Sequence, residues 1–235
     1  MSIPAYSNPS GIPATRTKVL ACATVIEEMQ PLLPPDMPRQ VLDFGLHLRP
    51  NQLTQTLQAA IDQSLEADLI LLGYGLCSRA VVGLRANHCT LVVPRVDDCI
   101  AIFLGSRNAH RQQACQEPGT YYLTKGWIEV GDSPFSEYRR LVERYGEQRA
   151  ERMTRLMLKH YTRLAFINTG QYEIERFRAY ARQAAERFGL RFEEIAGAPS
   201  LVNKLLFGPW DDEIVVAGPG ETITYEMFLN VSDNV

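Results

Sequence analysis

The chain has 235 residues, of which 46% are apolar and 22% are charged, and its formal net charge at pH 7 is −3. This length is enough for one large domain or two smaller domains with proper cores, and the composition is that of a globular protein. The charge balance gives no electrostatic reason to expect a nucleic acid or an anionic membrane as partner. No apolar run approaches the roughly 20 residues that span a bilayer.

Residues 1–17 are polar and rich in Pro, Ser and Gly, and they lack the apolar core of a secretory signal. We interpret them as a flexible or loosely docked arm, and we expect the protein in the cytoplasm. Disulfides are rare in that compartment, so the five cysteines are expected to be thiols or metal ligands.

Apolar runs and helical spacings alternate along the rest of the chain. Strands are predicted over 18–25, 41–48, 68–72, 89–96, 120–130, 163–170, 191–197 and 212–220. Helices are predicted over 51–65, with Asn51 as its cap, and over 78–88, 136–160, 174–188 and 200–208, while 98–106 is either a short helix or extended.

This alternation, with strands that are continuously apolar, predicts a Rossmann-like α/β fold: a mostly parallel sheet with helices on both faces. Two arrangements fit the order. The chain forms either two similar halves, 18–115 and 116–235, or one domain with a continuous sheet.

Three cysteines stand at the ends of predicted strands. Cys22 ends the run KVLAC, Cys77 follows in LLGYGLCS, and Cys99 follows in LVVPRVDDC. In open α/β sheets, ligands bind beyond the carboxyl ends of the strands, so three thiols at such ends are expected to meet at one edge. A single strand-end cysteine is ordinarily a small buried apolar group, and we interpret Cys89, at a strand start, and Cys115, in a polar loop, as residues without a role in the site.

Three thiolates form a soft ligand set that suits an iron–sulfur cluster, zinc or copper(I), and they leave one coordination position open. We therefore expect Cys22, Cys77 and Cys99 to hold a [4Fe–4S] cluster or zinc, with a small anionic molecule at the open position. The planar fork of Arg95 is expected to bind that anion, and Asp98 is expected to orient it or move a proton. The other candidate substrate-binding residues are Tyr74, Gly75, Lys125 and Trp127, although packing is the more ordinary role of a tryptophan.

Other motifs are missing from the sequence. Ser78 stands where G-x-G-x-x-G requires its third glycine, and there is no P-loop or nucleophile elbow. The four histidines, His47, His88, His110 and His160, show no paired metal-ligand spacing.

The combination of GYGLC, PRVDDC, LGS and GTYYLTKGW resembles the domain-of-unknown-function 1638 family of bacteria and archaea, over roughly residues 18–220. Members of that family are often encoded beside corrinoid methyl-transfer systems, so the resemblance implies one-carbon or metal metabolism and a corrinoid or methyltransferase partner. The family pattern has His-Asp-Cys where this chain has Asp97-Asp98-Cys99, so a histidine role at position 97 does not carry over. The three cysteines do carry over, as Cys22, Cys77 and Cys99.

Four functions stay open at this point. The first is a metalloprotein with an open site for a small anionic ligand, and the second is a zinc-thiolate or corrinoid-linked methyl-transfer protein. The third is a non-catalytic carrier of metal or sulfur, and the fourth is a binding protein with buried cysteines and no metal.

Overall fold

The computed structural model describes residues 6–77, 79–130, 133–170 and 173–229. Residues 1–5 of the expected arm and Ser78 lie outside this part of the chain. The chain divides into two compact units: unit 1 comprises residues 1–107 and 198–235, and unit 2 comprises residues 108–197. This division differs from the expected halves 18–115 and 116–235, because the last strand of the chain pairs with the sheet of unit 1.

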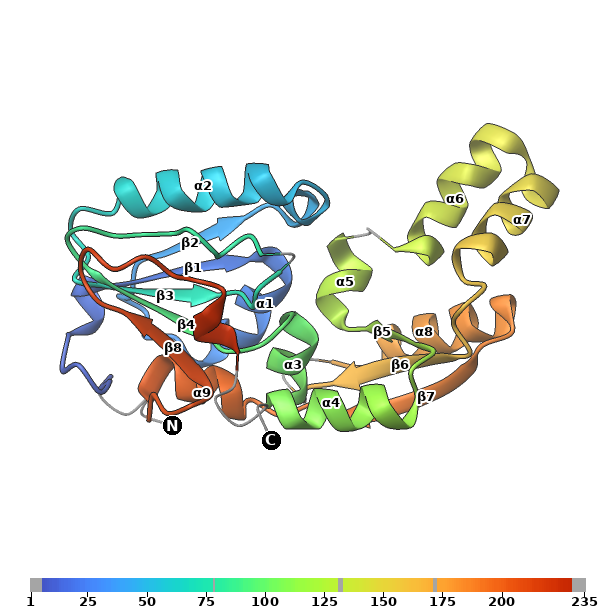
Figure 1. Ribbon diagram of the computed structural model, residues 1–235. Helices are drawn as coiled ribbons and strands as arrows, with labels where there is room; N and C mark the ends of the chain where they lie inside the picture. The colour runs from blue at the N-terminus through green and yellow to red at the C-terminus, as the bar shows by residue number, and fades with distance from the viewer. Residues whose placement is uncertain (1–5, 78, 131–132, 171–172, 230–235) are drawn as a thin grey trace. The chain divides into compact units, whose positions relative to one another are not determined.

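Unit 1 contains a five-stranded sheet (Figure 1). Its strands are β1 (Thr17–Cys22), β2 (Arg39–Leu42), β3 (Leu69–Gly73), β4 (Thr90–Pro94) and β8 (Ile214–Ala217), in the spatial order β2-β1-β3-β4-β8. The first four strands are parallel, and β8 is antiparallel to β4. Every residue of β3 is buried, as expected for a central parallel strand that is covered on both faces.

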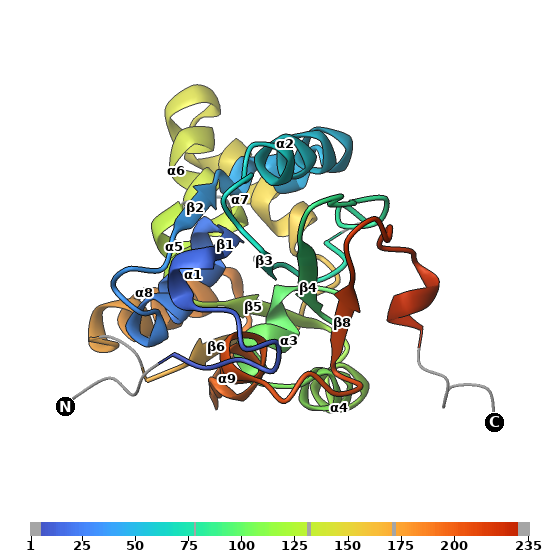
Figure 2. The same ribbon diagram turned by 90° about the vertical axis from the view of Figure 1, so that its left-hand side faces the viewer.

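The helices of unit 1 cover both faces of this sheet. They are α1 (Ala23–Met29), α2 (Pro50–Asp62), α3 (Cys99–Leu104) and α9 (Ser200–Phe207), with 3-10 helices at Ala14–Arg16, Gln30–Leu32, Phe44–Leu48 and Glu226–Phe228. Figures 1 and 2 show α2 and α9 on opposite sides of the sheet. The fold is therefore the expected α/β class, with mostly parallel strands between helices.

The strand order of unit 1 contains a reversal. The chain goes from β1 to β2 on one side, then returns past β1 to place β3 on the other side and continues to β4. The reversal point lies between β1 and β3. In open α/β sheets with this order, the connections leave β1 and β3 toward opposite faces, which opens a crevice at their carboxyl ends.

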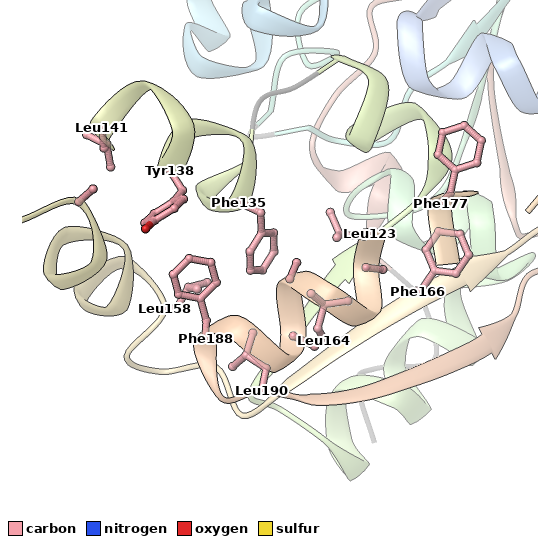
Figure 3. Close-up of a cluster of buried hydrophobic side chains, with 14 residues drawn as sticks. Leu123, Phe135, Tyr138, Leu141, Leu158, Leu164, Phe166, Phe177, Phe188 and Leu190 are labelled. Carbon is pink, nitrogen blue, oxygen red and sulfur yellow. The ribbon is translucent and has the colours of Figure 1, made fainter. Parts of the chain in front are cut away.

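Unit 2 contains a three-stranded parallel sheet in the order β5-β6-β7. Its elements are β5 (Thr120–Leu123), β6 (Arg163–Asn168), β7 (Arg191–Ala196), α4 (Arg107–Gln116, which starts at the unit boundary), α5 (Lys125–Val130), α6 (Pro134–Tyr145), α7 (Glu147–Met157) and α8 (Glu175–Phe188). Phe188 on α8 packs against Phe135 and Tyr138 of α6, with ring centroids 5.9 and 5.5 Å apart, in the core drawn in Figure 3.

Several predicted elements are shorter than expected. The helix predicted over 136–160 is divided into α6 and α7 at Gly146, whose φ of 76° belongs to the region that favours glycine. The strand predicted over 120–130 ends at Leu123, and α5 follows. In place of the helix predicted over 78–88, the described residues form turns over 79–83 and an isolated β-bridge from Arg85 to Thr222.

Two further differences affect the edge of the unit 1 sheet. The strand predicted over 18–25 ends at Cys22, and α1 starts at Ala23. The strand predicted over 41–48 ends at Leu42, because the Asp43 carboxylate accepts the Gly45 N–H at 2.8 Å and turns the chain into a 3-10 helix. The helix α2 then begins at Pro50 with Arg49 as its N-cap, rather than at Asn51.

None of the described helices is long and apolar enough to cross a membrane.

Candidate functional site

The three strand-end cysteines belong to the same edge of the unit 1 sheet. Cys22 is the last residue of β1 and the N-cap of α1, Cys77 follows β3, and Cys99 is the first residue of α3, just after β4. Because β1, β3 and β4 are adjacent and parallel, their carboxyl ends lie at one edge. Cys22 and Cys77 thus flank the reversal between β1 and β3.

Two loops pack together beneath Cys77 and Cys99. The Leu76 N–H donates to the Val96 carbonyl at 2.8 Å, and the Cys77 N–H donates to the Asp97 carbonyl at 3.1 Å. A Cβ atom on Gly75 would lie 2.8 Å from the Val96 carbonyl oxygen, so only glycine allows this approach. Cys77 itself has a φ of 45°, a left-handed conformation that costs a non-glycine residue about 1–2 kcal/mol.

The three thiols are buried and influence one another. Their exposed fractions are 1% for Cys22, 9% for Cys77 and 7% for Cys99. Burial raises the pKa of all three, to about 12 for Cys77, and a negative charge on Cys22 raises the pKa of the other two further. The Cys22 Sγ also lies 3.1 Å from the Thr24 hydroxyl. The thiols are therefore protonated at neutral pH and close enough to interact electrostatically.

Tyr74 lies at the same edge, directly after β3. It is 1% exposed, and its hydroxyl oxygen is buried with no hydrogen-bond partner among the described residues. Burial raises the pKa of Tyr74, and negative charges on Cys22 and Cys77 add to that increase. The Tyr74 hydroxyl therefore keeps its proton and is free to donate a hydrogen bond at this edge.

The two charged residues expected at this edge have different surroundings. The Asp98 carboxylate caps α3 by accepting the Ile100 N–H at 2.9 Å, which fixes the position of Cys99. Arg95 is half-buried, and its backbone N–H donates to the Glu213 carbonyl at 2.7 Å. Within the described structure, the Arg95 Nε atom is buried and has no partner.

His47 is a neighbour of this edge that the sequence pattern did not reveal. It lies in the 3-10 helix that follows β2, and its ring centroid is 6.0 Å from that of Tyr74. Its Nε2 atom is buried and unpartnered in the part of the chain that the structure describes, and burial lowers its pKa. The Asp-x-Gly sequence at Asp43 is typical of a turn, so it could have predicted that the strand ends there and that His47 lies after it.

The sulfur atoms are not placed as a finished metal site. Among the described residues, no group of three or more His, Cys, Asp or Glu side chains is arranged to hold a metal ion. A cavity of about 390 Å³ lies elsewhere, at the opposite edge of the sheet, where Lys18, Arg39 and Ser64 contribute to its lining.

Two of the expected site residues belong to unit 2. Lys125 and Trp127 are both on α5; Lys125 pairs with Glu129 at 3.1 Å, and Trp127 packs against the unit 2 core. Cys89 is buried just before β4, at the far end of that strand from Cys99. Cys115 is exposed on α4 rather than in a loop.

The comparisons with known proteins identify a family. The family model described as "protein of unknown function (DUF1638)" matches residues 41–206, which is more than half of the chain. The chain belongs to this family. The DUF1638 match includes Cys77, Cys99 and His47, and it begins after Cys22, whereas the resemblance extended to residue 18. No curated protein and no solved structure matches the chain.

Proposed function

We propose that this DUF1638 member is a metalloprotein in which Cys22, Cys77 and Cys99 hold a soft metal, either as a [4Fe–4S] cluster or as a single zinc ion. The observation that supports this proposal is that Cys22, Cys77 and Cys99 follow the carboxyl ends of three adjacent parallel strands, β1, β3 and β4, and that two of them flank the reversal between β1 and β3. That is the place where this kind of sheet binds its ligands. Three thiolates leave one coordination position for a small anionic molecule.

Metal binding requires two changes at this edge. The three thiols must lose their protons. A soft cation promotes this loss because its positive charge offsets the repulsion between neighbouring thiolates. The sulfurs must also turn toward a common point. A cysteine side chain has a single torsion with three staggered positions, so each sulfur can turn without movement of the backbone.

The neighbouring residues have separate roles in this proposal. Asp98 positions Cys99 by capping α3, and its expected part in orienting the ligand or moving a proton stays a prediction. Arg95 binds the anionic ligand through its guanidinium, whose Nε is buried without a partner in the described residues. A reducing cytoplasm, where thiols persist, is the setting that we propose, and a corrinoid or methyltransferase partner stays a prediction.

The test is the content of iron, zinc and acid-labile sulfide after strictly anaerobic purification. We expect metal in the wild-type protein and its loss in Cys77→Ala and Cys99→Ala. The matched control is Cys89→Ala, because Cys89 is as deeply buried but lies at the other end of β4. Cys115→Ala provides an exposed control.

The controls decide how the result is interpreted. Iron and sulfide that disappear only in the two edge variants would support a cluster, and zinc that disappears in the same variants would support a single ion. Metal-free wild-type protein, or metal that persists in Cys77→Ala, would contradict the proposal and leave the three thiols as packing groups.

A further inference from the structure

Two buried polar atoms, on residues that follow β2 and β3, have no partner in the described structure. They are the hydroxyl oxygen of Tyr74 and Nε2 of His47. A buried polar group is nearly always hydrogen-bonded, because removing it from water without compensation is costly. The rings of His47 and Tyr74 are neighbours, with centroids 6.0 Å apart. One bound molecule could therefore satisfy both unpartnered atoms.

The positions of the two residues indicate what they surround. His47 follows β2 and Tyr74 follows β3, while β1 runs between these two strands and ends at Cys22. Their ring contact thus bridges the strands on either side of β1, at the edge where Cys22 lies.

We propose that His47 Nε2 and Tyr74 Oη form a binding site for the carboxylate of a small molecule. This inference rests on the function proposed above and deepens it, because it names the chemical class of the small anionic ligand. Each ring donates one N–H or O–H to a carboxylate oxygen.

The chemistry of the surroundings favours a carboxylate over other anions. A carboxylate has two acceptor oxygens, which match two neutral donors, and it carries only a single negative charge. Phosphate carries more charge and is ordinarily held by several backbone N–H groups at a helix N-terminus. The helix that begins next to Cys22, α1, has only seven residues.

The experiment follows the imidazole NMR signals of the protein during titration with acetate, inorganic phosphate and neutral acetamide. The chain has four histidines, so His47→Gln assigns the signal of His47 by its disappearance. We expect acetate to shift that signal saturably, with a dissociation constant roughly in the millimolar range for so small a ligand. Tyr74→Phe should weaken acetate binding about tenfold, because one hydrogen bond to a charged group is lost. Tyr161→Phe, in unit 2, is the control.

The outcomes separate this inference from the metal proposal. No acetate-dependent shift of the His47 signal, an equal affinity in Tyr74→Phe, or tighter binding of phosphate or acetamide would each overturn the inference. If the wild-type protein lacks metal but binds acetate through these two residues, the metal proposal fails and the inference stands. If metal is bound and the His47 signal ignores acetate, the inference alone fails.

Discussion

Replacing Tyr74 by phenylalanine should make the protein more stable. The substitution removes only the hydroxyl group, and in the described structure this hydroxyl is buried with no hydrogen-bond partner. An unpartnered buried hydroxyl costs about 1–3 kcal/mol, while the aromatic ring and its packing are retained. We therefore expect the free energy of unfolding of unit 1 to rise by about 1–2 kcal/mol, which corresponds to an increase in Tm of about 2–4 °C per kcal/mol.

The two tryptophans allow the units to be followed separately. Trp210 belongs to unit 1 and Trp127 to unit 2. In a Trp127→Phe background, urea unfolding followed by Trp210 fluorescence reports the unit that contains Tyr74. Each Tyr74→Phe measurement is then compared with the same background without it, so that only the hydroxyl differs.

A second tyrosine gives a control of opposite sign. The Tyr138 hydroxyl accepts a hydrogen bond from the Arg187 guanidinium, so Tyr138→Phe should destabilise unit 2 by about 1–2 kcal/mol, as followed by Trp127 in a Trp210→Phe background. If Tyr74→Phe instead lowers the free energy of unfolding by a similar amount, the Tyr74 hydroxyl is already bonded within the protein. The reasoning that reserves it for a ligand would then be refuted.

Three further predictions concern other parts of the fold. Burial raises the pKa of Cys89 to about 11 in the folded protein, so the stabilisation from its protonated thiol is complete below the unfolded pKa and is lost as the pH rises to about 11. Between about pH 9 and 11 this loss lowers the free energy of unfolding by about 1.4 kcal/mol per pH unit, and Cys89→Ala should remove that contribution. Urea unfolding measured across this pH range checks the prediction. Gly75→Ala should lower both metal content and Tm, whereas Gly218→Ala, whose Cβ would meet nothing closer than 3.9 Å, should change neither. The Arg163 side chain is almost completely buried and donates hydrogen bonds to Thr120, Gln113 and Glu193. Arg163→Ala should therefore lower the free energy of unfolding of unit 2 by about 2–3 kcal/mol, as followed by Trp127 fluorescence, and an unchanged urea midpoint would contradict this.

The local sequence was sufficient to predict the fold class but not the division into units. Continuous apolar runs such as LILL and TLVV identify buried parallel strands, because both faces of such strands are covered. The pairing of β8 with β4 joins residues that are at least 120 positions apart, such as Leu91 and Ala217. No local pattern encodes that pairing, so the sequence alone could not show that unit 2 is inserted between two segments of unit 1.

The candidate site was predictable only in part for the same reason. Strand ends can be recognised locally, so Cys22, Cys77 and Cys99 could be assigned to one edge from the alternation of strands and helices. Their order along the edge, and the reversal between β1 and β3, depend on which strands pair. His47 was missed because the strand predicted over 41–48 placed it inside a strand, while the turn at Asp43 places it after β2.

The carboxyl edge of the unit 1 sheet also concentrates local costs to stability. Cys77 holds a left-handed conformation, and Tyr74 and His47 each bury an unpartnered polar atom in the described structure. Both kinds of feature oppose folding, the first through backbone strain and the second through hydration that is lost without a replacement hydrogen bond. The free energy of unfolding of a protein is only about 5–15 kcal/mol, so packing alone does not explain several such costs at one edge. A carboxylate ligand would offset the cost of the two polar atoms, since it supplies their missing hydrogen-bond partners, and the binding energy of a metal held by Cys77 would offset the strain at that residue.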